Sequence, residues 1–414
     1  MTPRDRPLRP RRGAALLTAL VGLVVIALMI SGAFFSSTQE FRGGRNQLVE
    51  QRAFAVAEYG LNSEVSNWDR ARNLPGGMAV GAIDSSRVYV AAGDTARVRI
   101  TRLTDKSYWV VSEGMASIGN TALESKRATS AYVRLAYPAI APRGAITTAG
   151  NISIGGSAQV FGTNTSPTGW SQCSSLGGPS QVPALAVGPN ATVSLGGNGN
   201  GNGNGGTSYP GGGANTVLNT TSGSKSFVTG DTVLVRTSAA VDSNTYVRFG
   251  TETWNSLVAN ADVTLSSNVI NGIAPVGTAT TCDRTSTSNW GEPYRSGNGL
   301  VVGCYGYFPI IYVTGSTTIN ANGRGQGILL VNGDLTMNGN FEWFGMIIVR
   351  DDIVTGSGNS KIMGAVYSRN INLSDQSVVN GNPDVIYSSC AVESSLRGSS
   401  ILVRVKERHW AQLQ

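Results

Sequence analysis

The chain has 414 residues, of which 41% are hydrophobic, 14% are charged and one is histidine, and its 53 glycines lack a G-X-Y period. These values exclude collagen, a protein that crosses the membrane many times and sites built on several histidines, and they indicate a turn-rich β protein. The first thirteen residues hold five arginines and one aspartate, so they supply +4 of the net charge of +7. A nucleic-acid-binding protein gathers its basic residues on the folded part, and we therefore expect no nucleic-acid partner.

The N-terminal segment predicts one long helix over residues 14–72. No charged residue lies between Ala14 and Gln39, and this stretch is long enough to span a bilayer. The arginines before it predict a single-pass protein of the inner membrane, with a cytoplasmic leader and an exported remainder. Further on, apolar residues recur at the spacing of an amphipathic helix, at Phe54, Ala57, Leu61, Val65 and Trp68. Gly43-Gly44 is expected to loosen the helix between the two halves.

The segments RRGAALLTALVGLVVIALM and SSTQEFRGGRNQLVEQRAFAVAEYGL resemble the N-terminus of the PilX-type minor pilins, over about residues 11–68. The resemblance implies a prepilin-type leader at residues 1–13, which a prepilin peptidase removes by cutting between Gly13 and Ala14. It also implies that the helix binds other pilin or pseudopilin subunits. Bulk pilins carry Glu at mature position five, where this chain has Thr18, and this difference argues against a bulk filament subunit.

Residues 73–137 predict a small antiparallel β region like the one that follows the helix in pilins. The runs RVYVAA, TARVRITRL, SYWVVSEGMA and RATSAYVRLAY alternate β-branched or aromatic residues with polar ones. Turn residues separate them at Gly93-Asp94 and Asp105-Lys106.

An internal repeat predicts a β-solenoid over residues 138–400, with about 18 residues per coil. Copies begin at Pro309, Gly327, Gly345 and Gly364, and an earlier copy begins at Gly144. Ile311, Leu329, Ile347 and Val366 align, as do Thr317, Leu335 and Ile353, which predicts inward-facing columns. The pattern is similar to that of bactofilin-like solenoids, and a β-sandwich is the alternative.

Two further segments complete the predicted body. A large insertion of about residues 199–308 interrupts the coils. The low-complexity stretch from Gly196 to Gly213 is expected to be a flexible exposed loop, and residues 253–264 are expected to contain a short amphipathic helix. Residues 401–414 are expected to form a C-terminal cap segment. The predicted fold is therefore mainly β, with one long N-terminal α-helix.

The four cysteines all lie in the part predicted to be exported, where disulfides persist. Four cysteines allow three pairings. Cys282 and Cys304 flank one loop and form the preferred pair, which leaves Cys173 with Cys390. Their spacing is unlike that of a metal site, and we expect neither a metal nor a cofactor.

Two charged pairs recur one coil apart, Asp334 with Asp352 and Arg350 with Arg369. Carboxylates at the strand spacing of about 5 Å suit a Ca²⁺ site or a retaining glycosidase. A solvated ladder of charges at the coil corners explains the same spacing without any ligand, and we favour it. His409 is expected to be a surface or cap residue.

Three functions fit these patterns. We favour a non-enzymatic, membrane-anchored minor pilin that takes part in assembly of a type IV pilus or pseudopilus at a priming or tip position, with the solenoid outside the cell. The second is a surface-anchored β-helical adhesin or carbohydrate-binding protein, whose glycan or surface ligand is not specified by the sequence. The third is a β-helical polysaccharide lyase or hydrolase.

Overall fold

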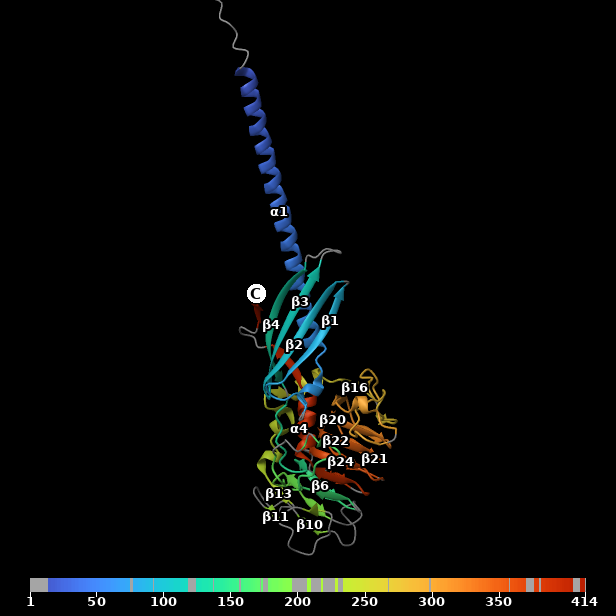
Figure 1. The fold of residues 1–414 in the computed structure, drawn as a ribbon. Coiled ribbons are helices and arrows are strands. Elements are labelled where there is room, and N and C mark those ends of the chain that lie inside the picture. Colours follow the sequence, from blue (N-terminus) through green and yellow to red (C-terminus); the bar gives the residue numbers. More distant parts are fainter. Residues whose placement is uncertain are drawn as a thin grey trace, which may run out of the picture.

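The computed structural model describes residues 14–404 and 410–413, with gaps at 75–76, 92, 118–123, 137, 156–157, 172, 174–177, 196–206, 210–216, 219–227, 230–233, 267, 298, 357, 370–375 and 380. Gly13 with the rest of the leader, most of the low-complexity stretch and His409 lie outside the described residues. Figure 1 shows three parts in a line: a long helix, an antiparallel sheet beside its lower end, and a larger β body below the sheet.

Helix α1 (Ala14–Ser66) is one unbroken helix of 53 residues, about 80 Å long at 1.5 Å per residue. The expected loosening at Gly43-Gly44 was wrong, because the helix runs through both glycines. Each glycine costs a helix only about 1 kcal/mol relative to alanine, which does not interrupt its hydrogen bonding. The helix ends at Ser66, before the predicted residue 72, and a 3₁₀ turn η1 (Arg70–Asn73) follows.

The antiparallel sheet contains the four predicted strands in chain order, β1 (Ile83–Ala91), β2 (Asp94–Thr104), β3 (Ser107–Ser117) and β4 (Glu124–Ala136). The C-terminal strands β27 (Ile401–Arg404) and β28 (Trp410–Leu413) both pair with β4. The expectation that residues 401–414 cap the body was therefore wrong. The body is an insertion between β4 and β27, and Ala136 and Ile401 pair directly.

The body is built around two sheets, and the late strands of the chain, from the 310s to the 370s, alternate between them. The first sheet runs in the order β11 (Val217–Leu218), β13 (Leu234–Arg236), β8 (Leu185–Val187), β5 (Ile146–Thr148), β24 (Lys361–Ser368), β22 (Glu342–Val349), β20 (Arg324–Val331), β18 (Ile310–Val313) and β16 (Val263–Leu265), with β7 (Gln159–Phe161), β12 (Val228–Thr229) and β26 (Asp384–Tyr387) branching from β24. The second runs in the order β10 (Thr207–Tyr209), β9 (Val193–Leu195), β6 (Asn151–Ile154), β25 (Gln376–Val379), β23 (Ile353–Thr355), β21 (Leu335–Asn338), β19 (Thr317–Asn320) and β17 (Val269–Ile270).

The parallel register of the late strands follows the sequence repeat. In the first sheet Ile311 pairs with Leu329, Leu329 with Ile347 and Ile347 with Val366, and all four side chains are buried. The predicted column is therefore confirmed. In the second sheet the register that aligns Thr317 with Leu335 and Ile353 is also observed. Apolar residues at these period-2 positions fill the space between the two sheets.

The order of strands in the stack differs from their order in the chain. β24 pairs with β5, and β25 pairs with β6, so the late coils continue into the copy that begins at Gly144. The predicted insertion also contributes to the stack. β13 extends it beside β8, while β16 and β17 add strands beside β18 and β19 at the other end. These strands are two or three residues long, too short to show a period in the sequence.

Short helices cover the outer side of the first sheet. α2 (Asn244–Val247) and α3 (Trp254–Ala259) pack there beside the two-strand pair β14 (Arg248–Phe249) and β15 (Glu252–Thr253). α4 (Ser389–Gly398) packs on β20, β22 and β24 and leads the chain back to the antiparallel sheet. Two 3₁₀ turns, η3 (Ser238–Ala240) and η4 (Val302–Cys304), complete the covering segments.

Candidate functional site

The upper part of α1 exposes its apolar side chains. Leu16, Leu20, Ile30 and Phe34 are between 62% and 76% exposed in the single chain. Among the described residues, α1 is the one helix long and apolar enough to cross a membrane. Burying one large apolar side chain is worth about 1.5–3 kcal/mol, so this surface favours lipid or other apolar helices as its surroundings.

The start of the helix carries the residues that the sequence singled out. Ala14 is the first helical residue, and Gly13 before it lies outside the described residues. The Thr18 hydroxyl donates a hydrogen bond of 3.0 Å to the carbonyl oxygen of Ala15. Position 18 is therefore neutral, and its hydroxyl is bonded within its own helix.

The lower part of α1 lies unusually close to the sheet. A Cβ atom added at Gly114 in β3 would lie 2.2 Å from the carbonyl oxygen of Ala53 and 2.4 Å from the nitrogen of Ala57. Ala53 and Ala57 are fully buried, and Leu61 one turn on belongs to the same packed face. Gly114 was not among the predicted site residues, although a glycine inside a strand signals close approach of another backbone.

Two ion pairs fix the rotation of α1 where it enters the sheet. Arg52 Nε lies 2.8 Å from Asp94 Oδ2, and the carboxylate of Asp94 is nearly buried. Glu50, two residues before Arg52 in α1, forms an ion pair with Arg127 of β4. The helix is thereby held at both β2 and β4.

A third ionic contact lies at the end of α1. The Arg72 guanidinium is 2.7 Å from Glu64 and 2.9 Å from Asp84. Burial alone would lower the pKa of Arg72, but hydrogen bonds and charge from Glu64, and then from Asp84, raise this pKa above its ordinary value. The guanidinium therefore joins α1, η1 and β1 as a permanent cation.

A buried amide joins the helix, the sheet and the body. Asn73 Oδ1 accepts hydrogen bonds from Trp68 Nε1 at 3.1 Å and from the Tyr108 hydroxyl at 3.2 Å. Asn73 Nδ2 donates one of 2.9 Å to Ser400 Oγ, at the point where the chain returns from the body. No sequence signal marked Asn73, because its partners lie on three separate segments.

The structure contains the bridges Cys173–Cys390 and Cys282–Cys304, the arrangement expected from the sequence. The first ties the loop after β7 to the start of α4. The second closes the segment before β18. Both therefore tie a loop to a short helix or a 3₁₀ turn.

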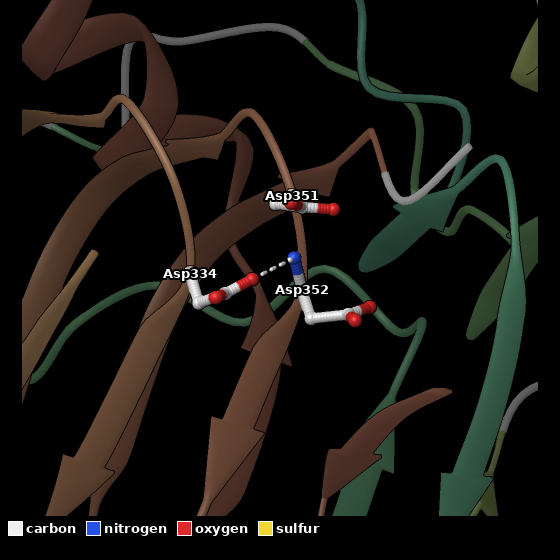
Figure 2. A group of neighbouring side chains, drawn as sticks. All are labelled: Asp334, Asp351 and Asp352. Carbon is white, nitrogen blue, oxygen red and sulfur yellow. Dashed lines mark hydrogen bonds between the residues drawn. The ribbon is translucent and has the colours of Figure 1, made fainter. Parts of the chain in front are cut away.

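Three aspartates meet at a corner of the stack, Asp334, Asp351 and Asp352, with one carboxylate oxygen from each within 4.8 Å of the others (Figure 2). The cluster is bonded to the coils themselves. Asp334 Oδ1 accepts from the backbone nitrogen of Asp352 at 3.2 Å, and Asp352 Oδ1 accepts from Ser377 Oγ at 3.1 Å. These bonds join neighbouring strands of the stack, and Asp352 is buried, unlike the solvated ladder expected from the sequence.

A groove of about 320 Å³ lies between the covering helices and the stack. Arg350 lines it and is held by two contacts, a bond of 3.0 Å to Asn332 Oδ1 and a position 5.5 Å above the centre of the Trp254 ring. Arg248 also lines the groove. Arg350 and Arg369 occupy equivalent backbone positions in successive coils, each donating its N–H to the coil before.

Comparison with known proteins identifies the helix. Residues 12–62 match the family PilX N-terminal. The N-terminal segment is therefore similar to that family. The matched segment comprises the upper part of α1 and most of the helical turns that pack on the sheet. It ends before β1.

The chain aligns with a solved structure, the competence-associated pilin ComZ from Thermus thermophilus. It is 13% identical, the alignment covers 89% of this chain and 97% of that one, and the TM-score is 0.21. No curated protein matches the chain.

Proposed function

We propose that the protein is a minor pilin that takes part in assembly of a type IV pilus or pseudopilus. The observation that carries this proposal is the exposed apolar face of α1 in a segment of the PilX type. A single chain leaves this face uncovered, whereas a membrane covers it before assembly and neighbouring pilin helices cover it afterwards. The role is structural, and no reaction is assigned to the protein.

The topology of the proposal follows from the N-terminus. Prepilin peptidase cuts between Gly13 and Ala14, and α1 crosses the inner membrane once with the leader in the cytoplasm. The sheet and body lie on the exported side, where the two disulfides are stable. After assembly the body is displayed outside the cell as a β-solenoid of about 18 residues per coil.

A priming or tip position suits this subunit better than a repeating one. A charge within a membrane is tolerated mainly when it is paired, and Thr18 provides no carboxylate to pair with the N-terminal ammonium of a neighbour. The body is also inserted between β4 and β27 at the lower end of the sheet, where it adds bulk to each subunit (Figure 1).

Two measurements test the proposal. Sequencing of the mature N-terminus is expected to begin at Ala14, and Gly13→Leu is expected to leave the leader attached, while the outer variant Arg9→Ala is cleaved normally. Quantitative proteomics of sheared filaments is expected to find few copies per filament, far below the number of major subunits. An intact Met1 in the wild type refutes the pilin assignment, and equal stoichiometry with the major subunit refutes the tip position.

The second candidate is a surface-anchored adhesin or carbohydrate-binding protein. The groove lined by Arg248, Asn255 and Arg350 favours it, because guanidinium groups and an amide suit an acidic sugar. Processing at Gly13 distinguishes the two candidates, since an anchor alone needs no prepilin peptidase.

A further inference from the structure

The antiparallel sheet carries exposed apolar side chains, and Ile83, Tyr89, Leu103, Trp109 and Tyr132 lie on its side away from α1. Beyond α1, nine large hydrophobic side chains are exposed among the described residues. Two of them, Val241 and Val269, lie in the body. The other seven lie in or just before the sheet, namely Val80, Ile83, Tyr89, Val90, Leu103, Trp109 and Tyr132. Scattered exposed residues need no explanation, but such clustering marks an interaction site.

The strand register gathers part of this surface into one row. Ile83 lies opposite Thr101, Thr101 opposite Trp109, and Trp109 opposite Tyr132. Trp109 is 42% exposed and Tyr132 37%, whereas their chain neighbours on the α1 side are buried. The row crosses β1 to β4, and we refer to this side of the sheet as the outer face.

Arginines lie beside the row without a matching number of acids. Arg87 on β1 lies directly opposite Arg97 on β2, and Arg99 is the next outward residue along β2. Glu113 lies opposite Arg97 on β3. None of these three arginines forms an ion pair with a described residue. Because these arginines lack ion-pair partners, the outer face carries positive charge that its own fold does not neutralise. Like charges directly opposite each other also destabilise a sheet.

The composition of the outer face favours a protein partner. Tryptophan, tyrosine and arginine are the residue types enriched in the energetically dominant part of protein interfaces, and lysine is depleted there. Aliphatic side chains such as Ile83 and Leu103 add apolar area that neither stacks on bases nor bonds to sugars. β1 is also an edge strand, since its one described neighbour is β2.

From these observations we infer that the outer face docks an acidic protein surface. Carboxylates of the partner meet Arg87, Arg97 and Arg99, while its apolar side chains cover Trp109 and Tyr132. Opposite charges increase the association rate and fix the orientation, and the aromatic row supplies the buried area. The inference concerns a surface distant from the apolar part of α1 and does not depend on the pilus assignment.

The test uses the full chain in detergent and two acidic probes, a random Glu-Tyr copolymer and a single-stranded oligonucleotide of equal charge. Biolayer interferometry is expected to show binding of the copolymer that weakens as salt is added. The double variant Arg97→Ala/Arg99→Ala is expected to weaken the dissociation constant about tenfold or more, and Trp109→Ser to weaken it less. Arg143→Ala, an exposed arginine of the body, is the matched control and should bind as the wild type does.

Three results would overturn the inference. They are no binding of the copolymer, binding that the double variant leaves unchanged, and tighter binding of the oligonucleotide that the double variant abolishes. The last result assigns the face to nucleic acid instead. Because these arginines are exposed and unpaired, the double variant is expected to fold, and an unchanged thermal melt verifies this.

Discussion

Gly114→Ala tests the close packing of α1 on the sheet, because two physical effects predict opposite signs. In a strand, replacing glycine by alanine ordinarily stabilises by about 0.5–1 kcal/mol, since the unfolded chain loses freedom. Here the new Cβ would lie 2.2 Å from the carbonyl oxygen of Ala53, and an ordinary contact begins at 3.4 Å. The atoms in conflict belong to the helix backbone, which has no alternative rotamer.

The helix and β3 must therefore separate by more than 1 Å over a buried face that includes Ala57. Overpacking of this kind typically costs about 1–3 kcal/mol, and we expect the upper end because backbone meets backbone. For a cooperatively unfolding unit of about 150–250 residues, about 3 kcal/mol corresponds to a decrease of roughly 6–12 °C in the melting temperature. Hydrogen exchange should quicken in the lower part of α1 and remain unchanged in β20, β22 and β24.

Gly315→Ala is the matched control. An added Cβ there meets nothing within 4 Å, so its melting temperature should stay the same or rise slightly. If Gly114→Ala also melts at or above the wild-type temperature, the close approach of helix and sheet is wrong.

Three further changes test the interior. Val331→Asp places an unpaired charge at a fully buried position and should destabilise the body by several kcal/mol, about 3 or more, whereas Thr336→Asp on the outward side should alter the melt little. Cys282→Ser opens a bridge across 22 residues and should lower stability by about 3 kcal/mol; an unchanged melt would show that the bridge does not contribute. Asn73→Leu leaves buried polar partners unsatisfied and should cost about 1–3 kcal/mol in unfolding experiments, a result that a well-tolerated leucine would contradict.

Periodicity explains which parts of the fold the sequence could predict. The 18-residue repeat aligned Leu329 with Ile347, and the structure pairs them, because stacked coils require the same residue types at the same positions. The strands β1 to β4 likewise showed their own alternation. The N-terminal helix was evident from its uncharged stretch and its resemblance to PilX-type pilins.

Pairing between distant segments has no such signal. The alternation of one strand does not identify its neighbour, so the return of β27 to β4 and the contact of β24 with β5 were not predicted. Asn73 and Gly114 were missed for a related reason. Their roles depend on backbone and side chains that meet them only after the helix, the sheet and the body have come together.

The permuted order of the stack also determines when the body can finish folding. Ile146 of β5 pairs on one side with Leu185, which is synthesised soon afterwards, and on the other side with Val366, which is synthesised 220 residues later. Until then β5 has an open edge, and contacts of such high sequence separation form slowly. The Cys173–Cys390 bridge spans 217 residues and belongs to the same late step. A chain truncated before β24 would therefore retain an unpaired strand in the middle of its body and be prone to aggregate during synthesis.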